Sequence, residues 1–158
     1  MQNTDLFPSD SAEQAGVRPQ VTAAVTRGVS RLFQDLGCSC LTEFRLPNGR
    51  RADVAALTPK GQLIISEVKS CQADFTGDQK WNEYIPFCDA FYFAVDEAFP
   101  KSLLPDEPGL IVADGFHGAI VREAPEHGLA PARRKSLTLK YARQAAVRLA
   151  HLQAIAQL

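Results

Sequence analysis

The amino-acid sequence predicts a single α/β domain in which a mixed central sheet of about five or six strands is flanked by helices. Two observations lead to this fold class. Short apolar, β-rich segments recur through the middle of the chain, separated by stretches rich in Pro, Gly, Asp and Asn. Longer segments with apolar residues at helical spacing lie nearer the two ends. A chain of 158 residues, of which 46% are hydrophobic, fits one domain with an ordinary core.

The chain is expected to begin with a loose leader and to continue as one domain. Residues 1–18 are mostly polar and contain Pro8 and Gly16 without a sustained period, whereas the domain occupies residues 19–158. The first residues have neither the basic nor the apolar part of a secretory signal, and no apolar run reaches the 18 residues that a membrane span needs. We therefore expect a cytoplasmic protein without membrane contact.

The first helix is predicted over residues 19–37. Its apolar residues recur at helical spacing, Pro19 suits the first turn, and Gly37 can end the helix in the left-handed conformation. A strand over residues 38–46 follows and runs into a Pro-Asn-Gly turn at 47–49. This strand leads into the segment that carries the chemistry.

Residues 50–57 and 63–69 are predicted to form a β-hairpin. Both segments are β-compatible, and the Pro-Lys-Gly sequence between them suits a type I turn followed by a left-handed residue. In such a three-residue loop Thr58 pairs with Gln62. This pairing fixes the register of the whole hairpin.

The register places Asp53 opposite Glu67. Directly opposed residues on antiparallel strands have Cβ atoms about 4.5–5.5 Å apart, and Lys69 shares the face of Glu67 because the strand period is two. Two carboxylates that face each other repel, and a hard divalent ion relieves the repulsion. The pair therefore predicts a Mg²⁺ or Mn²⁺ site, at which Lys69 can orient the attacking water and offset charge on a phosphate.

A surface salt bridge, worth about 0–1 kcal/mol, is the alternative interpretation of these three charges. The apolar residues around Glu67 argue against it. Leu63, Ile64, Ile65 and Val68 are typical of a buried central strand, where a charge without a function is costly.

The segments RADVAAL and EVKS resemble the PD-(D/E)xK motif of the restriction-endonuclease-like nucleases, with Ala52 in place of the proline. Together with DFTGDQKWNEY and CDAFYFAV, they resemble the MmcB-like DNA-repair family over residues 19–150. The resemblance implies a restriction-endonuclease-like core. It also implies that Asp53 and Glu67 bind the metal with the backbone carbonyl of Val68, and that Lys69 is the catalytic lysine.

Many members of the superfamily add an acidic residue from the first helix. Here that helix offers only Asp35, near its end, so Glu43 on the following strand is the substitute candidate for a catalytic role. A solvated strand glutamate is the alternative for Glu43. We further expect Arg51, at the head of the motif, to contact the substrate.

The segment after the second hairpin strand is predicted to form a short helix over residues 79–84. Lys80 and Tyr84 would share a face of it and contact the nucleic acid, in resemblance to a Gln-xxx-Tyr signature of the superfamily. Gln79 is a weaker candidate because its spacing from the tyrosine differs by one. Trp81 is interpreted as core packing rather than as a platform for a base.

Three further strands are predicted over residues 88–95, 109–113 and 119–123, of which the first should lie beside the Glu67 strand by family topology. The last two form a hairpin around a turn that contains His117, which we interpret as a turn residue rather than a catalytic one. A helix is predicted from Ser136 onwards.

The charge of the chain is unevenly distributed. Residues 127–158 contain six Lys or Arg and no Asp or Glu, whereas the formal charge of the whole chain is −1. This predicts a basic C-terminal helix that binds a polyanion, although a helix with a simply solvated basic face explains the pattern as well. The four cysteines are expected to be free thiols, since one Cys-x-Cys pair and two isolated cysteines do not favour a zinc or iron–sulfur site.

The sequence thus predicts a Mg²⁺- or Mn²⁺-dependent nuclease that hydrolyses DNA phosphodiester bonds in repair. It contains no base-reading module, so we expect selection by DNA structure or recruitment by a repair-protein partner. The alternative is a repair accessory that keeps the fold and binds nucleic acid or a partner without turnover. Cleavage of RNA also stays open, because the motif acts on phosphate and not on the sugar.

Overall fold

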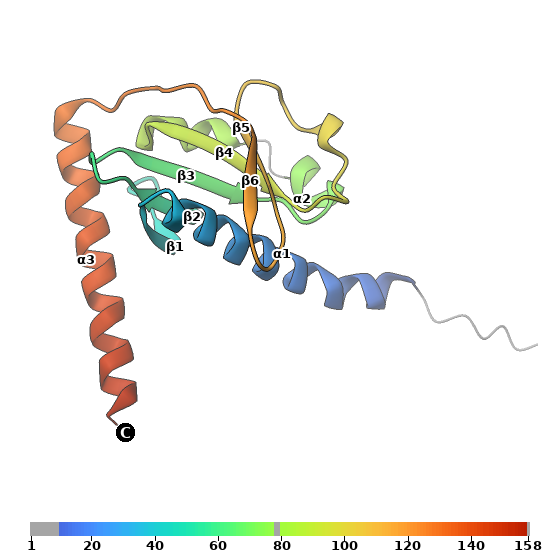
Figure 1. Ribbon diagram of the computed structural model, residues 1–158, viewed down its shortest axis with the longest axis horizontal. Helices are drawn as coiled ribbons and strands as arrows, with labels where there is room; N and C mark the ends of the chain where they lie inside the picture. The colour runs from blue at the N-terminus through green and yellow to red at the C-terminus, as the bar shows by residue number, and fades with distance from the viewer. Residues whose placement is uncertain (1–9, 78–79, 158) are drawn as a thin grey trace, which may run out of the picture.

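The computed structural model describes residues 10–77 and 80–157, which form one six-stranded mixed sheet flanked by helices (Figure 1). The predicted α/β fold class is therefore confirmed. The strands lie side by side in chain order. Their bounds are β1 Ser39–Arg45, β2 Arg51–Leu57, β3 Leu63–Val68, β4 Ala90–Val95, β5 Gly109–Ala113 and β6 Gly118–Arg122.

The sheet is antiparallel at both edges and parallel at its centre. Strands β1, β2 and β3 form an antiparallel meander, β4 and β5 each run parallel to the strand before, and β6 returns antiparallel to β5. The predicted position of β4 beside β3 is confirmed. All six residues of β4 are buried, as expected of a central strand covered on both faces.

Helix α1 (Asp10–Asp35) covers one face of the sheet with an apolar stripe that includes Val25, Val29 and Phe33. The helix ends as predicted. Gly37 has φ +83°, and its N–H and that of the next residue bond back into the last turn, as in a Schellman motif. The start differs from the prediction, because the helix continues through Pro19. Residues 10–18, predicted to be a loose leader, are therefore helical.

The connection between β3 and β4 also differs from the prediction. It contains α2 (Gln72–Gly77) and two 3₁₀ turns, η1 (Trp81–Glu83) and η2 (Ile85–Phe87), in place of an α-helix over 79–84. The N–H groups of Glu83, Tyr84 and Phe87 bond to carbonyls three residues back. Proline at position 86 cannot donate a hydrogen bond, which favours this short irregular connection over a longer helix.

An aromatic cluster fills the other face of the sheet. The Trp81 ring stacks on Phe91 with a centroid distance of 5.9 Å, and the Tyr84 ring stacks on the same phenylalanine at 5.5 Å. Phe93 meets Phe91 edge-on at 5.2 Å. Trp81 is therefore a packing residue, as predicted.

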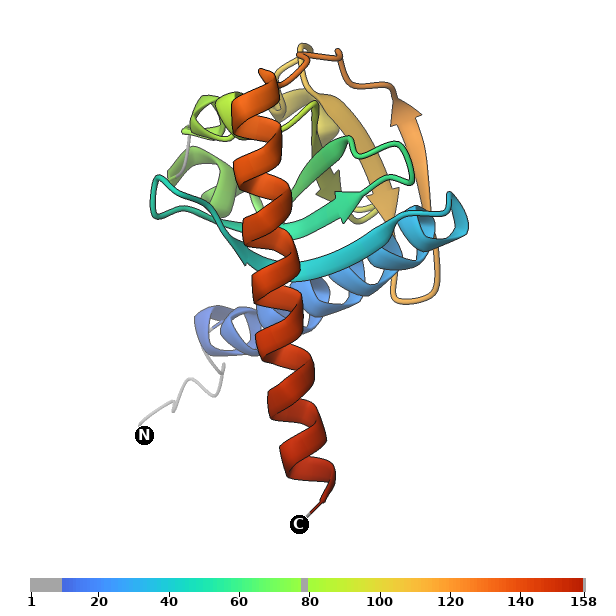
Figure 2. The same ribbon diagram turned by 90° about the vertical axis from the view of Figure 1, so that its left-hand side faces the viewer.

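Helix α3 (Pro131–Ala156) packs on this second face near β1, and its C-terminal half extends beyond the sheet (Figure 2). It starts five residues before the predicted Ser136, with Pro131 in the first turn, a position that a proline tolerates well. Leu137 and Tyr141 are its buried residues. Among the described residues, no helix is long and apolar enough to cross a membrane.

A short helix, η3 (Lys101–Leu103), lies in the loop between β4 and β5. The β5–β6 turn is held by Asp114, whose Oδ1 accepts hydrogen bonds from the N–H groups of Phe116 and His117. The exposed His117 ring lies 2.9 Å from the same oxygen. This places His117 in a turn, as predicted.

Candidate functional site

The β2–β3 hairpin has the register that its turn predicts. The N–H of Thr58 donates to the carbonyl of Gln62 at 2.9 Å, and Gly61 takes φ +81°. The ladder then pairs Leu57 with Leu63 and continues in the same register to Val54 opposite Ser66. One further step along this register leads to Asp53 and Glu67.

The two strands separate at that step. Asp53 Oδ2 accepts a hydrogen bond of 2.7 Å from the N–H of Val68, which takes the place of the next backbone pair. The N–H of Lys69 instead bonds to Ala94 of β4 at 2.9 Å. Because the N–H and C=O of one strand residue point to the same side, the Val68 carbonyl faces β2 and the Asp53 carboxylate. The separated ends thus bring the Asp53 carboxylate to the backbone of Val68, two of the three groups proposed as metal ligands.

Glu67 and Lys69 lie on the face of the sheet that carries the aromatic cluster. They are only 9% and 5% exposed, and Lys69 Nζ lies 4.0 Å from Glu67 Oε1. Burial of this degree does not fit the alternative of a solvent-exposed salt bridge, because desolvating two charges is expensive. Glu67 and Lys69 are therefore buried side by side at the end of β3.

The pKa of the Asp53 carboxyl group is shifted upward in the fold. Burial raises the pKa of Asp53, and the nearby Glu43 carboxylate raises it further, whereas the Val68 N–H and the Lys69 ammonium lower it; the net shift is upward. A carboxylate with a raised pKa is one whose negative charge is incompletely compensated. A divalent ion would supply the missing compensation.

The donor set decides which metal fits. Within residues 10–77 and 80–157, no three His, Cys, Asp or Glu side chains form a metal-binding cluster. Two carboxylates and a backbone carbonyl remain, all of them hard oxygen donors. Magnesium commonly uses one or two protein carboxylates and completes its shell with waters and substrate phosphate, so Mg²⁺ or the similar Mn²⁺ fits this set.

Glu43 lies next to Asp53 in the sheet. The register of β1 and β2 places it opposite Asp53, and it takes φ +53°, the one positive value for a non-glycine residue among the described residues. Its carboxylate forms an ion pair with the Arg51 guanidinium, and its backbone carbonyl accepts a hydrogen bond of 2.7 Å from the Arg148 guanidinium. Glu43 and Arg51 are thus adjacent to the site and bound to each other.

Contrary to the prediction, Tyr84 and Lys80 do not share a surface. Tyr84 is buried, its hydroxyl donates to the Arg51 carbonyl at 3.4 Å, and the Arg50 guanidinium lies 5.5 Å above its ring. Burial, and to a lesser extent the nearby Glu67 carboxylate, raises the pKa of Tyr84. Lys80 is exposed at the start of the 3₁₀ turns. Tyr84 therefore borders the Glu67 site, and Gln79 lies outside the described residues.

One acidic residue near the site was missed in the sequence. Asp74 of α2 accepts hydrogen bonds from both the hydroxyl and the N–H of Ser70, the residue after Lys69. Burial alone would raise the pKa of Asp74. The hydrogen bonds from Ser70, a further hydrogen bond from Cys71 and the positive charge of Lys69 lower the pKa overall. The spacing of four residues between Ser70 and Asp74 is the signal that could have indicated this capping contact.

The comparisons with known proteins identify the family. The model of the family described as DNA repair protein MmcB-like matches residues 9–156. The chain belongs to the MmcB-like family of DNA repair proteins. This MmcB-like protein is also similar in structure to the SPO1766 protein of unknown function from Silicibacter pomeroyi, with 46% sequence identity and a TM-score of 0.82. The match covers 85% of this chain and 92% of the other. No curated protein matches the sequence. Family membership indicates a role in DNA repair.

Proposed function

We propose that this MmcB-like protein is a divalent-metal-dependent nuclease that hydrolyses DNA phosphodiester bonds during repair. The observation that supports it is the meeting of Asp53, Glu67 and Lys69 at the separated ends of β2 and β3. Such a set is costly to bury without a function.

In this proposal Asp53, Glu67 and the Val68 carbonyl hold Mg²⁺ or Mn²⁺. When bound, the ion polarises the scissile phosphate and lowers the pKa of a coordinated water. Lys69, held beside Glu67, orients the attacking water and balances the negative charge that develops on the phosphate. Tyr84 closes the site from the aromatic side and limits the access of bulk water to Glu67.

A repair accessory without turnover is the second candidate. One observation favours it: the nearby Glu43 carboxylate, which could have served as a third acid, is already paired with Arg51. An accessory would bind DNA equally well with and without a divalent ion. A nuclease would need the ion for cleavage.

The test is to incubate the purified protein with labelled single-stranded, duplex, flapped and branched DNA, and with RNA, in Mg²⁺, Mn²⁺ or EDTA. Lys69→Ala is the variant, and Lys101→Ala, which removes a partly exposed lysine paired with Glu97, is the matched control. We expect cleavage only with metal, lost in the first variant and kept in the second. Binding of DNA without cleavage of any substrate would refute the nuclease proposal and support the repair accessory.

A further inference from the structure

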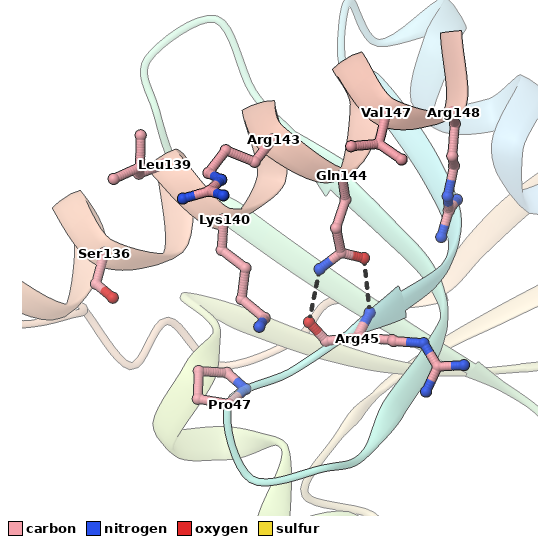
Figure 3. A pocket seen from close by; sticks show the side chains of 9 residues that line it. All are labelled: Arg45, Pro47, Ser136, Leu139, Lys140, Arg143, Gln144, Val147 and Arg148. Carbon is pink, nitrogen blue, oxygen red and sulfur yellow. Dashed lines mark hydrogen bonds between the residues drawn. The ribbon is translucent and has the colours of Figure 1, made fainter. Parts of the chain in front are cut away.

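A groove runs between α3 and the end of β1 (Figure 3). Nine residues line it, and they include four cations and no carboxylate. The lining residues are Arg45, Pro47, Ser136, Leu139, Lys140, Arg143, Gln144, Val147 and Arg148. Neither Lys140 nor Arg143 forms an ion pair with any carboxylate in the described part of the chain. We propose that this groove binds the phosphate backbone of duplex DNA beside the cleavage site, an inference that rests on the proposed function.

The wall that carries these cations is fixed to the sheet. The Gln144 amide bonds both backbone groups of Arg45, accepting from its N–H at 3.1 Å and donating to its carbonyl at 2.9 Å. The Tyr141 hydroxyl donates to the carbonyl of Ser39 at 2.6 Å, and Arg148 donates to the carbonyls of Thr42 and Glu43. The charged side chains therefore extend from backbones whose relative positions are already set, which lowers the entropy cost of binding.

The groove leads to the proposed metal ligands. Arg45 pairs with Arg51 across β1 and β2, and Asp53 lies two residues further along, which is about 7 Å at the rise of a β-strand. Each strand of duplex DNA carries one charge per about 3.4 Å of helix axis. A backbone held at Arg45 would thus place a phosphate about two positions away near Asp53.

The lining also distinguishes among polyanions. None of the nine described residues that line the groove is aromatic, whereas proteins that bind single strands stack the bases on aromatic rings. Phosphate contacts alone suit a duplex, whose bases are already stacked. The apolar Leu139 and Val147 could instead favour an acidic helix of a partner protein, but four cations close to a phosphodiester site favour DNA.

The test compares Lys140→Ala/Arg143→Ala with Lys60→Ala/Lys101→Ala, which removes the same charge outside the groove. Duplex binding is measured by fluorescence anisotropy in EDTA across a salt series, so that no cleavage occurs. We expect the groove variant to bind at least about tenfold more weakly and its salt slope to fall by about 1.8, at roughly 0.9 per phosphate contact. The control should keep the wild-type slope.

Three outcomes would overturn the proposal that the groove binds duplex DNA. They are an equal loss of affinity in both double variants, unchanged duplex affinity in the groove variant, or tighter binding of single strands than of duplex by the wild type. Unchanged binding would direct attention to an acidic protein partner. The result is independent of the nuclease proposal, because binding is measured in EDTA, where metal-dependent cleavage does not occur. A wild type that binds through the groove but never cleaves would refute the nuclease and leave the groove in place.

Discussion

Replacing Asp89 by alanine should loosen the attachment of α3 to the sheet. The Asp89 carboxylate is 3% exposed and accepts four hydrogen bonds. Two come from Arg134 of α3, at 2.8 and 2.6 Å, and two from the N–H groups of Leu63 and Leu129, at 2.8 and 3.2 Å. Asp89→Ala removes all four and leaves Arg134 without its carboxylate.

The expected loss follows from this geometry. Breaking a buried ion pair by removing one partner costs about 3–5 kcal/mol. The Arg134 side chain is still 33% exposed, so water can replace part of the interaction, and the lower end, about 3 kcal/mol, applies. For a domain of this size, about 2–4 °C of melting temperature is lost per kcal/mol, which gives a decrease of roughly 6–12 °C.

The assay is thermal unfolding at pH 7, followed by far-ultraviolet circular dichroism. Asp106→Ala is the matched control, because Asp106 pairs with Arg122 at 3.5 Å on the surface, where solvent screens the ion pair and little stability is lost with it. A decrease of less than about 3 °C for Asp89→Ala, or an equal decrease for both variants, would refute the assignment of Asp89 as the anchor of α3.

Three other predictions follow from the structure. Gly28→Ala should destabilise the protein by about 1–3 kcal/mol in denaturant unfolding. The added Cβ would lie 2.2 Å from the carbonyl oxygen of Asp114 and 2.6 Å from the carbonyl oxygen of His117. An unchanged denaturation midpoint would contradict this packing. Burial alone would raise the pKa of Asp89, but hydrogen bonds from Arg134 and from Leu63 and Leu129 N–H groups lower it overall, so its contribution to stability is complete above the ordinary pKa near 4 and declines as the pH falls through the lowered native value. Melting temperatures between pH 6 and 2 should therefore fall less steeply for Asp89→Asn than for the wild type, and parallel curves would argue against this linkage. Tyr84→Phe should keep the fold, because the stacking on Phe91 remains, while slowing cleavage; full activity would show that the hydroxyl has no part in the site.

Local chemistry made the centre of the site predictable from sequence. The register of the β2–β3 hairpin depends on three turn residues, of which Gly61 takes the left-handed conformation that its turn type requires. Because that register is local, the pairing of β2 with β3 from Leu57 and Leu63 to Val54 and Ser66 could be worked out without tertiary information. The separation of the strands beyond Val54 and Ser66 could not, since it depends on a side chain that replaces a backbone partner.

Tertiary packing accounts for the predictions that were wrong. The period of four between Lys80 and Tyr84 predicts a shared helical face, but stacking on Phe91 and the following proline favour 3₁₀ turns that bury the tyrosine alone. Proline at position 19 is a good first residue of a helix, yet packing of α1 on the sheet stabilises a helix that extends on both sides of it.

The contacts of α3 could not be predicted from the sequence either. A basic segment without acids indicates a polyanion surface or a solvated helix equally well. Only the fold shows that Arg148 donates to the carbonyl of Glu43, and that Gln144 holds Arg45 about 7 Å from the level of Glu43 along β1. These contacts connect the basic helix to the candidate site.

The most direct test of the central claim is the single-turnover rate of DNA cleavage in Mn²⁺ for Asp53→Asn. Asparagine keeps an oxygen that can accept from the Val68 N–H, so the fold should be retained while the negative charge is lost. Asp35→Asn is the control, since Asp35 is exposed at the end of α1. We predict a rate lower by at least about 100-fold for Asp53→Asn, within the range for losing a group that acts on the reacting atoms, and an unchanged rate for the control. Equal cleavage by the wild type and by a folded Asp53→Asn variant would contradict the account.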